Sequence, residues 1–317
     1  MTPRLRVAAA QIAPVWLDRE RSLARVIEQI DRAAVAGVEL LAFGECLVPG
    51  YPFWVERTDG ARFDAALQKD LFAHYVDQAI CIEDGHLAEV CEAARRNAMT
   101  VVLGLLERPA DRGESVYASA VSIAADGVIK ACQRKLVPTY EERLVWAAGD
   151  GHGLRTHRVG AFTVGALNCW ENWMPLARAS LQGQGEDLHV ALWPGSDRLT
   201  RDITRFMALE GRSFVLSAGG LMRRDDWPAD LPHAERLKQV TDDMPWANGG
   251  SCIAAPDGRW LVEPVVDQEG LFMADLDMRE VRRARQNFDP SGHYSRPDVL
   301  RLKVNRARQA VLDLGQD

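Results

Sequence analysis

The sequence lacks the short motifs that mark several common enzyme classes. Its 317 residues contain no GxxxxGK[ST] phosphate loop, GxGxxG turn, HExxH pair or GxSxG elbow, so nucleotide-binding, zinc-protease and serine-hydrolase activities lose their usual support. The six cysteines have no CxxC or CxxH spacing. His152, His157 and His189 are the nearest grouping of histidines, and we interpret them as solvated or hydrogen-bonded side chains. We expect neither a metal nor an organic cofactor.

Long apolar runs and an excess of positive charge are also missing. The chain has 38 Lys and Arg against 45 Asp and Glu, a net charge of −7, and its average field therefore repels phosphate backbones and anionic lipid. No apolar run approaches the ~20 residues of a membrane span. Cysteines without a disulfide pattern suit a reducing compartment. We expect a cytoplasmic protein that binds neither nucleic acid nor membrane.

Short apolar runs alternate with helical spacing along the first third of the chain. Residues 5–12, 38–43 and 100–106 are apolar runs of strand length, and helical periodicity separates them around residues 23–34 and 87–94. Apolar runs without alternation are typical of strands buried on both faces. The pattern therefore predicts an α/β fold in which helices cover a sheet.

Two antiparallel strand pairs interrupt this alternation. Residues 116–124 and 128–131 are joined through an Asp-Gly pair, which is a hairpin signal, and residues 251–255 and 260–265 form a second pair. Further strands are predicted over residues 162–167, 188–193 and 213–217, with helices over residues 175–181, 202–211 and around the Arg-rich residues 281–285. The sheet arrangement is therefore mixed. Because no Pro- or Ser-rich linker divides the chain, we expect one domain over residues 1–317.

A cysteine stands at the end of one predicted strand. Cys169 follows the apolar residues 162–167 at a turn toward a helix, and α/β sheets bind ligands at the carboxyl ends of their strands. Backbone N–H groups at such a turn can hold a developing anion, and the positive end of the next helix favours a thiolate. Taken alone, a cysteine there is more often an inert core thiol, so a nucleophilic role needs a nearby base or cation.

Two charged residues occupy equivalent positions. Glu45 ends the apolar run of residues 40–44, and Lys135 ends the second strand of the first hairpin. A charge directly behind an apolar run is costly to bury unless it is paired. The two side chains therefore form either a structural ion pair or part of a polar pocket shared with Cys169.

These segments together resemble the carbon–nitrogen hydrolase superfamily, and its nitrilase branch in particular, which pairs a Glu, a Lys and a Cys. The matching stretches are residues 44–54, 134–139 and 168–171. Trp170 after Cys169 is similar to the nitrile-hydrolysing branch, whereas amidase relatives more often carry Tyr or Phe there. Further similar stretches extend the resemblance from Val7 to Asp298: residues 189–194, 208–212 and 292–298.

The resemblance implies a four-layer αββα sandwich with mixed sheets. It also implies that Cys169 is the nucleophile, Glu45 the general base and Lys135 the cation that stabilises developing charge. Glu142, seven residues after Lys135, matches the second family glutamate, which positions the lysine and the substrate. By the same resemblance, five residues lie near the substrate: Tyr51, Trp54, Trp146, Trp170 and Pro194.

The resemblance further implies the reaction and the assembly. The sulfur attacks a nitrile carbon to give a thioimidate, and two waters then convert this adduct, through a thioester, to a carboxylic acid and ammonia. Family members form dimers and often extend into spirals. We therefore expect a homodimer with the segment from about residue 290 at a subunit interface, and a larger spiral oligomer is the alternative.

Other activities stay open on the sequence. An amidase or carbamoyl hydrolase of the same superfamily uses the same residues as a nitrilase. A non-catalytic interaction protein keeps the fold without using Cys169. A cysteine protease is less favoured, because no histidine lies in a segment that accompanies Cys169.

Overall fold

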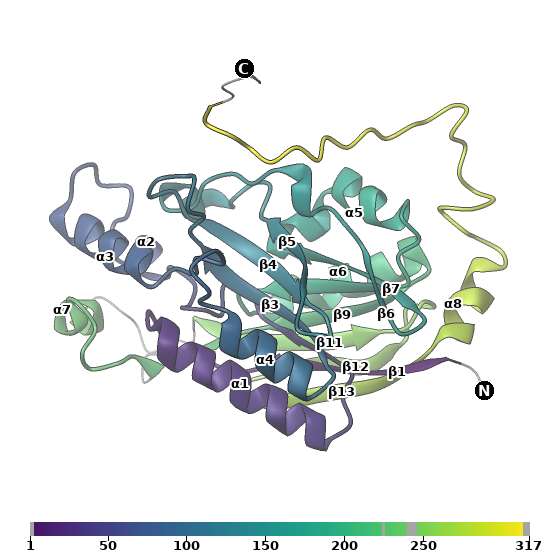
Figure 1. Ribbon diagram of the computed structural model, residues 1–317, viewed down its shortest axis with the longest axis horizontal. Helices are drawn as coiled ribbons and strands as arrows, with labels where there is room; N and C mark the ends of the chain where they lie inside the picture. The colour runs from purple at the N-terminus through teal and green to yellow at the C-terminus, as the bar shows by residue number, and fades with distance from the viewer. Residues whose placement is uncertain (1–2, 224–225, 240–245, 313–317) are drawn as a thin grey trace.

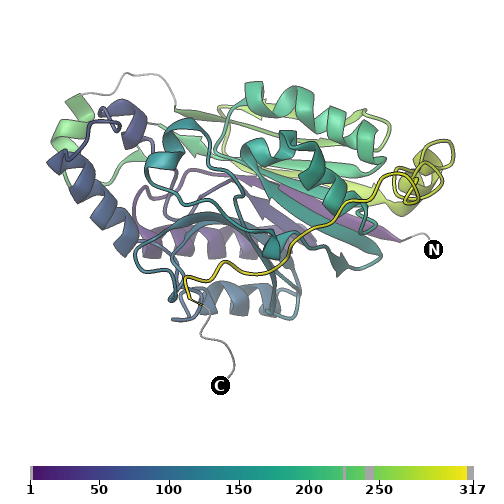
Figure 2. The same cartoon turned by 90° about the horizontal axis from the view of Figure 1, so that it is seen from above.

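The computed structural model describes residues 3–223, 226–239 and 246–312. Two mixed β-sheets pack face to face, and helices cover their outer faces, as Figures 1 and 2 show. Helices α1 (Arg19–Val35) and α4 (Ala88–Arg96) cover the first sheet, and α5 (Pro175–Gln182) and α6 (Asp197–Gly211) cover the second. The predicted αββα sandwich with mixed sheets is confirmed.

The first sheet contains the strands from the first half of the chain and one late strand. In spatial order its strands are β13 (Gly270–Asp277), β1 (Arg4–Gln11), β2 (Leu40–Phe43), β3 (Thr100–Glu107), β4 (Tyr117–Ile123) and β5 (Ile129–Arg134). Strands β1, β2 and β3 are parallel to one another, and the other pairings are antiparallel. The carboxyl end of β2 therefore lies inside the sheet, between two longer strands.

The second sheet repeats this arrangement. In spatial order its strands are β10 (Leu221–Met222), β11 (Ala247–Ala254), β9 (Phe214–Gly219), β8 (Leu188–Trp193), β7 (Phe162–Asn168) and β6 (His157–Val159), with β12 (Trp260–Val266) paired to β11. Strands β7, β8 and β9 are parallel. The remaining helices are α2 (Trp54–Arg57), α3 (Ala66–Asp77), α7 (Ala234–Gln239), α8 (Met278–Arg285) and the 3-10 turns η1 (Tyr140–Leu144), η2 (Gly151–Gly153) and η3 (Cys169–Trp173).

Apolar side chains fill the space between the sheets. Val7, Leu40 and Val102 from the first sheet and Val164 and Leu192 from the second belong to one buried cluster. Alternate residues of the first sheet's strands face α1 and α4, under which a second cluster lies. Because both faces of the central strands are buried, their sequences are continuously apolar.

Helix α1 illustrates how the local sequence fixes an outer layer. The Asp18 carboxylate accepts a hydrogen bond from the Arg21 N–H (2.7 Å) and so caps the first turn. Val26, Ile30 and Ala33 recur at helical spacing and are fully buried against the first sheet. The predicted helix thus begins at its cap and buries one face.

Two differences from the sequence prediction affect the site. Strand β5 extends to Arg134, past the predicted end at residue 131, so Lys135 is the first residue after the strand. Strand β13 was not predicted, although it pairs with β1 along its whole length, from Arg4 and Asp277 to Gln11 and Gly270. It lies at the edge of the sheet and is half-buried, so its sequence lacks the continuous apolar character of the inner strands.

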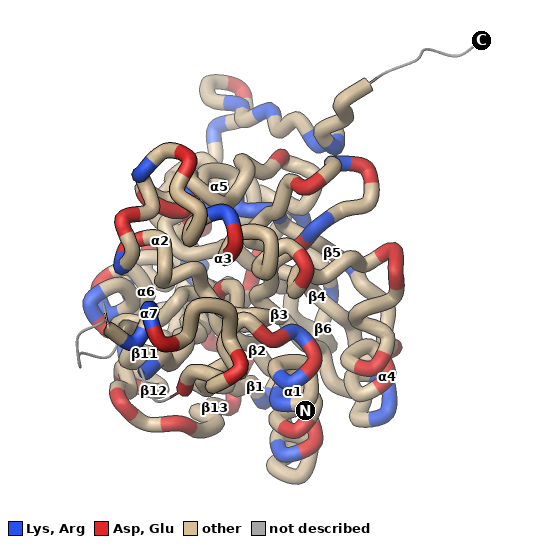
Figure 3. The backbone as a smooth tube through the Cα atoms, turned by 90° about the vertical axis from the view of Figure 1, so that its left-hand side faces the viewer, with Lys and Arg blue, Asp and Glu red and all other residues tan. Residues whose placement is uncertain are grey.

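Charged residues of both signs are interleaved on the side of the molecule shown in Figure 3, including along α1. Among the described residues, the structure contains no helix with the length and apolar character needed to cross a membrane. Every cysteine lies in the described part of the chain, and each is a free thiol.

Candidate active site

The carboxyl ends of three strands bring the predicted residues together. Glu45 lies two residues after β2, Lys135 directly after β5 and Cys169 directly after β7. Lys135 Nζ is 2.9 Å from Glu45 Oε1, and one ligating atom each of Glu45, Glu142 and Cys169 lie within 4.8 Å of one another. All four side chains are buried. The carboxylate and ammonium are therefore not an isolated ion pair but share one pocket with the sulfur.

Close backbone packing fixes Glu45. Its N–H donates to the Trp193 carbonyl of β8 (3.0 Å), which ties the end of β2 to the second sheet. A Cβ on Gly44 would lie 2.9 Å from that carbonyl oxygen, and a Cβ on Gly104 would lie 2.7 Å from the Glu45 Cα. Since only glycine permits such approaches, Glu45 sits at the seam where the two sheets meet.

Glu142 contacts Lys135 from another direction. Its Oε2 accepts hydrogen bonds from Lys135 Nζ (2.6 Å) and the Thr139 N–H (2.6 Å), and its Oε1 accepts one from the Tyr51 hydroxyl (2.8 Å). Thr139 and Glu142 also form a capping box at the start of η1. The carboxylate is held at three points, and it holds the ammonium in turn.

The buried charges perturb one another. Burial raises the pKa of Glu45 from its ordinary 4.5 to about 8, and although Lys135 opposes this shift, the neighbouring Glu142 adds to it. Burial alone would lower the pKa of Lys135, but the negative charges of Cys169, Glu45 and Glu142 raise it well above 10.5. The lysine therefore stays an ammonium, and the pKa of Glu45 is close to the neutral range in which a general base works best.

The thiol is protonated at rest. Burial and the negative charges of Glu45 and Glu142 raise the pKa of Cys169 well above 9.0, and Lys135 and the Trp170 N–H do not offset them. The favourable effect expected from the helix end is therefore outweighed, and the sulfur needs a base to lose its proton. The turn after the strand is a single 3-10 turn, η3, so desolvation and two nearby carboxylates outweigh its dipole.

Glu45 has free capacity to accept a proton. Within the described part of the chain, its two oxygens have no hydrogen-bond partner besides the contact with Lys135. A buried carboxylate that no donor besides this ammonium contacts is costly, and such a cost is typical of a functional site rather than of a structural ion pair. The arrangement suits a base that takes the Cys169 proton only when sulfur attacks.

Backbone strain gathers at the same place. Cys169 has a φ of +47°, Cys46 next to Glu45 has a φ of +49°, and Tyr140 two residues before Glu142 has a φ of +43°. Left-handed backbone at such residues costs on the order of 1–3 kcal/mol each and persists only where the surroundings enforce it. Three separate segments of the pocket therefore hold their functional side chains on strained backbone.

The pocket also contains the one group of candidate metal ligands found among the described residues: Glu45, Glu142 and Cys169. Lys135 Nζ lies 2.9 Å from the first carboxylate and 2.6 Å from the second. An ammonium at this position already supplies the positive charge that a metal would bring, and it repels a second cation. The donor set therefore fits acid–base chemistry better than metal binding.

Two of the residues predicted near the substrate border this cluster. The Tyr51 hydroxyl donates to Glu142, and the Trp146 ring lies 5.4 Å from Lys135 Nζ. The Tyr51 and Trp146 rings meet edge to face at 5.3 Å. These two aromatic side chains therefore pack against each other beside Glu142 and Lys135.

The other three lie in different surroundings. Trp54 is fully buried and packs against Trp16 and Tyr75. Trp170 is 47% exposed and its ring is 6.2 Å from that of Trp173. Pro194 is half-buried and follows Trp193, whose carbonyl binds the Glu45 N–H.

Sequence reasoning missed the polar residues that support the site. Glu171 accepts hydrogen bonds from the Asn168 N–H (2.9 Å) and the Leu136 N–H (2.8 Å), so one carboxylate links the segments that carry Cys169 and Lys135. Asn168 and Glu171 form a capping box. The N-x-x-E spacing of these two residues could have predicted the capping box from the sequence. The contact with Leu136 could not be predicted in this way, because it joins distant segments.

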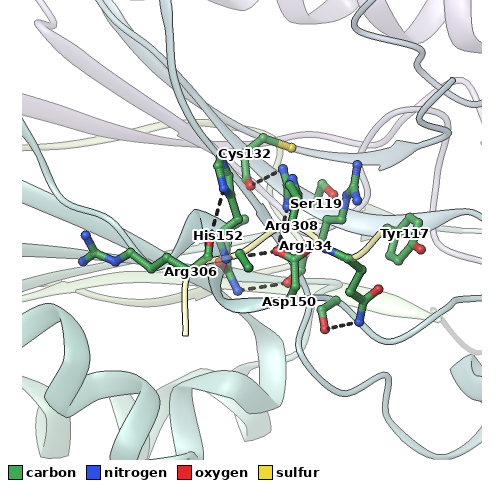
Figure 4. A network of polar contacts seen from close by, with 12 residues as sticks. Tyr117, Ser119, Cys132, Arg134, Asp150, His152, Arg306 and Arg308 are labelled. Atoms are coloured by element: carbon green, nitrogen blue, oxygen red, sulfur yellow. Dashed lines mark hydrogen bonds and ion pairs between the residues drawn. The ribbon is translucent and has the colours of Figure 1, made fainter. Parts of the chain in front are cut away.

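A second network surrounds the end of β5 (Figure 4). Arg308, near the end of the described chain, donates to Asp150 Oδ1 (2.9 Å) and to the Cys132 carbonyl (3.1 Å). Gly149, beside Asp150, donates its N–H to the Lys135 carbonyl (2.8 Å). The segment after α8 therefore fastens the loop that holds the lysine backbone, across 158 residues of sequence.

Comparisons with known proteins show the family to which the chain belongs. The sequence model of the carbon-nitrogen hydrolase family matches residues 6–286. The chain belongs to this family. An aliphatic nitrilase of Rhodococcus rhodochrous is 36% identical, with 96% of this chain and 80% of the relative covered. A nitrilase of Paraburkholderia phymatum is 37% identical (95% and 86% covered), and an arylacetonitrilase of Aspergillus niger is 34% identical (95% and 89%). The predicted resemblance to nitrilases is confirmed.

Solved structures share the fold of this carbon–nitrogen hydrolase. A carbon-nitrogen hydrolase from Helicobacter pylori superimposes with a TM-score of 0.70 at 17% identity, with 93% of this chain and 97% of that chain covered. An amidase from Nesterenkonia sp. gives a TM-score of 0.64 at 17% identity, with 88% and 92% covered. At this identity the likeness concerns the fold alone.

Proposed function

We propose that the protein hydrolyses organic nitriles to carboxylic acids and ammonia, with Cys169 as the nucleophile. The buried cluster of Cys169, Glu45 and Lys135 carries this proposal, because it joins a thiol, a carboxylate with room to accept a proton and a fixed cation. Relatives at 34–37% identity include aliphatic nitrilases, a nitrilase and an arylacetonitrilase. Their names support nitriles over other substrates with carbon–nitrogen bonds.

The first half of the reaction forms a covalent adduct. Glu45 takes the thiol proton while the Cys169 sulfur bonds to the nitrile carbon, and one bond of the C≡N group breaks to place an electron pair on nitrogen. Lys135 and the Trp170 N–H stabilise that charge, as the donors of an oxyanion hole do. Protonation of the nitrogen by Glu45 gives a neutral thioimidate and returns the base.

The second half consumes two waters. Glu45 deprotonates the first water, which adds to the thioimidate carbon, and the tetrahedral intermediate expels ammonia to leave a thioester. A second water adds in the same way, and the Cys169 sulfur leaves with a proton as the carboxylic acid is released. Had the first intermediate expelled sulfur instead, the product would be an amide, so a minor amide product is expected.

The close alternative is an amidase that uses the same side chains. Matched pairs of a nitrile and its amide, drawn from aliphatic, aryl and arylacetonitrile series, separate the two by the rate of ammonia release. We expect faster turnover of the nitrile, together with an adduct mass on Cys169. Faster turnover of every amide would assign the chain to the amidases.

Aromatic side chains at the pocket support a preference for apolar or aryl nitriles. We propose that Tyr51 and Trp146 contact the substrate, since both touch the Glu142 and Lys135 cluster. The roles proposed for Trp54, Trp170 and Pro194 rest on the family resemblance. Replacing Trp146 by Phe is expected to change the ratio of kcat/KM between aryl and aliphatic nitriles more than it changes protein stability.

We also propose a homodimer formed through the outer face of α5 and α6. Large apolar side chains are exposed there: Trp173, Leu176, Phe206 and Leu209. Apolar patches of this kind mark interaction surfaces. Sedimentation is expected to give a dimer for the wild type and a monomer for Leu176→Asp. Equal mass for both proteins would remove this face from the interface.

Other features of the protein stay predictions. They are one domain over the whole chain, a subunit contact by the segment from about residue 290, larger spiral oligomers and a cytoplasmic location. Chemistry without a metal or organic cofactor is a further one, and retention of full activity after dialysis against a chelator tests its metal part.

A further inference from the structure

A chain of buried polar side chains leads from β8 to the turn at Cys169. His189 Nδ1 lies 3.0 Å from Glu186 Oε1, and His189 Nε2 lies 2.7 Å from Asn172 Oδ1. Asn172 Nδ2 in turn donates to the Cys169 carbonyl (2.8 Å) and to the Leu167 carbonyl (3.3 Å). Glu186, His189 and Asn172 are at most 2% exposed, and the proposed reaction uses none of them.

The donors and acceptors in this chain can be assigned from one end. The Cys169 and Leu167 carbonyls only accept hydrogen bonds, so the nitrogen of the Asn172 amide faces them and its oxygen faces His189. His189 Nε2 must then carry a hydrogen. The Nδ1 contact with Glu186 holds one further proton, shared between the imidazole and the carboxyl group.

The chain ends on the strained residue of the site. Cys169 has a left-handed φ of +47°, and nothing in its own side chain favours that conformation. The Asn172 amide bridges the Leu167 and Cys169 carbonyls, which lie on either side of Asn168 at the start of the turn. An amide held at its far end by a histidine cannot rotate away from them, so the turn keeps its conformation.

We propose that Glu186, His189 and Asn172 are positioning residues that fix the Cys169 carbonyl and thereby the strained backbone that aims the sulfur. This inference rests on the proposed role of Cys169 as the nucleophile. It gives a role to the buried His189, which the sequence alone indicated only as a solvated or hydrogen-bonded histidine.

The packing around Glu186 supports the assignment. Gly165 of β7 is the register partner of His189 on β8, and a Cβ on Gly165 would lie 2.3 Å from Glu186 Oε1. The missing side chain leaves the space that the carboxyl group fills. A Gly165→Ala variant therefore displaces Glu186 while it keeps every polar group of the chain.

Three substitutions test the chain in graded steps. His189→Leu removes the donor to Asn172. Glu186→Gln keeps the hydrogen bonds, because its amide nitrogen donates to His189 Nδ1 while Nε2–H still donates to Asn172. Gly165→Ala disturbs the chain by volume alone. His157→Leu is the matched control, since His157 lies on β6 of the same sheet and neither of its buried ring nitrogens has a partner among the described residues.

The measurement is the second-order rate constant for alkylation of Cys169 by iodoacetamide, located by peptide mass, in protein shown to be folded by its thermal transition. Alkylation needs no nitrile, so its outcome is independent of whether the proposed substrate is right. We expect His189→Leu and Gly165→Ala to slow it about tenfold or more. We expect Glu186→Gln and His157→Leu to stay within about twofold of the wild type.

Turnover provides a second readout. With an accepted nitrile, His189→Leu and Gly165→Ala are expected to lower kcat while KM changes little, because the sulfur and not the pocket wall is displaced. If folded His189→Leu and Gly165→Ala are alkylated at the wild-type rate, the proposal is overturned. If His157→Leu lowers the alkylation rate as much as His189→Leu does, the proposal is overturned as well, because the effect then comes from disturbing the sheet in general. If His189→Leu does not fold, the alkylation rates of Gly165→Ala and Glu186→Gln are compared instead, and equal rates overturn the proposal.

Discussion

Replacing Glu45 by Gln should abolish turnover and at the same time stabilise the fold. Burial holds the pKa of Glu45 at about 8, against 4.5 for the exposed group. At pH 7, which is 2.5 units above the ordinary pKa of 4.5, the carboxyl group ionises in the unfolded chain and lowers its free energy. In the folded chain the group stays mostly protonated and does not contribute this free energy. At 1.36 kcal/mol per pH unit this is about 3 kcal/mol of lost stability. A neutral glutamine of the same shape removes that penalty.

The sign of the effect depends on pH. A carboxyl group whose folded pKa is raised weakens the fold as pH rises from the unfolded pKa to the folded one. The stability difference between Glu45→Gln and the wild type should therefore be near zero at pH 4.5, about 3 kcal/mol at pH 7, and should level off above pH 8. Lys135 keeps Glu142 as its partner throughout, so the variant does not leave a buried cation unpaired.

Urea unfolding at pH 5, 7 and 8.5, at one protein concentration, measures this difference. The control is Glu114→Gln, whose side chain is 72% exposed; it should change stability by less than about 0.5 kcal/mol at any pH. If Glu45→Gln is no more stable than the wild type at pH 7, the carboxyl group is not destabilised by burial. The account of Glu45 as a base tuned to neutral pH would then be wrong.

Three further outcomes are expected. In the free enzyme, kcat/KM should rise with pH toward a midpoint far above 4.5, because Glu45 with its raised pKa accepts a proton only when ionised; a midpoint near 4.5 would contradict this. Gly104→Ala should lower the free energy of unfolding by about 1–3 kcal/mol and lower kcat, because its Cβ would clash with the Gly44 and Glu45 backbone. Gly270→Ala is the control and should change neither, because there is room for a Cβ at that position. Arg308→Ala should lower stability in urea by about 1–2 kcal/mol through the loss of its contacts with Asp150 and the Cys132 carbonyl; no change would detach the terminal segment from the loop.

The inner strands of the sandwich were predictable because burial on both faces makes their sequences apolar without a break. Strands β3 and β8, over residues 100–107 and 188–193, are buried at every position. Strand β13 is half-buried at the sheet edge and was missed. Helix α3 was missed as well, because apolar residues outside its fully buried face, such as Phe72, obscure the helical spacing of its buried residues, which are Leu67, Leu71, Tyr75 and Val76. Continuity of burial made the inner strands predictable, whereas the half-buried β12 was predicted as the partner strand of a hairpin.

The positions of the reactive side chains were predictable, but their ionisation was not. Glu45, Lys135 and Cys169 each follow a predicted strand, but these positions alone left a structural ion pair and an inert thiol open. The resemblance of the three segments to nitrilases carried the prediction of their roles. The raised pKa of Glu45 depends on Glu142 and on complete burial, which arise only when both sheets are assembled. The chain from Glu186 to Cys169 is equally unreadable, because it depends on the register of two strands and on an absent side chain at Gly165.

The charge balance of the pocket connects its stability to its chemistry. Lys135 and Glu142 together are neutral, so ionising Glu45 adds one uncompensated negative charge to a buried site, and ionising Cys169 adds another. In water a glutamate is about four pH units too weak a base to take a proton from a cysteine. Burial raises the pKa of Glu45 to about 8 and so makes it a stronger base, but burial raises the pKa of Cys169 as well. Proton transfer must therefore accompany the attack of sulfur, in which the negative charge passes to the substrate nitrogen beside Lys135. The destabilisation that Glu45→Gln should relieve is the same quantity that strengthens the proposed base.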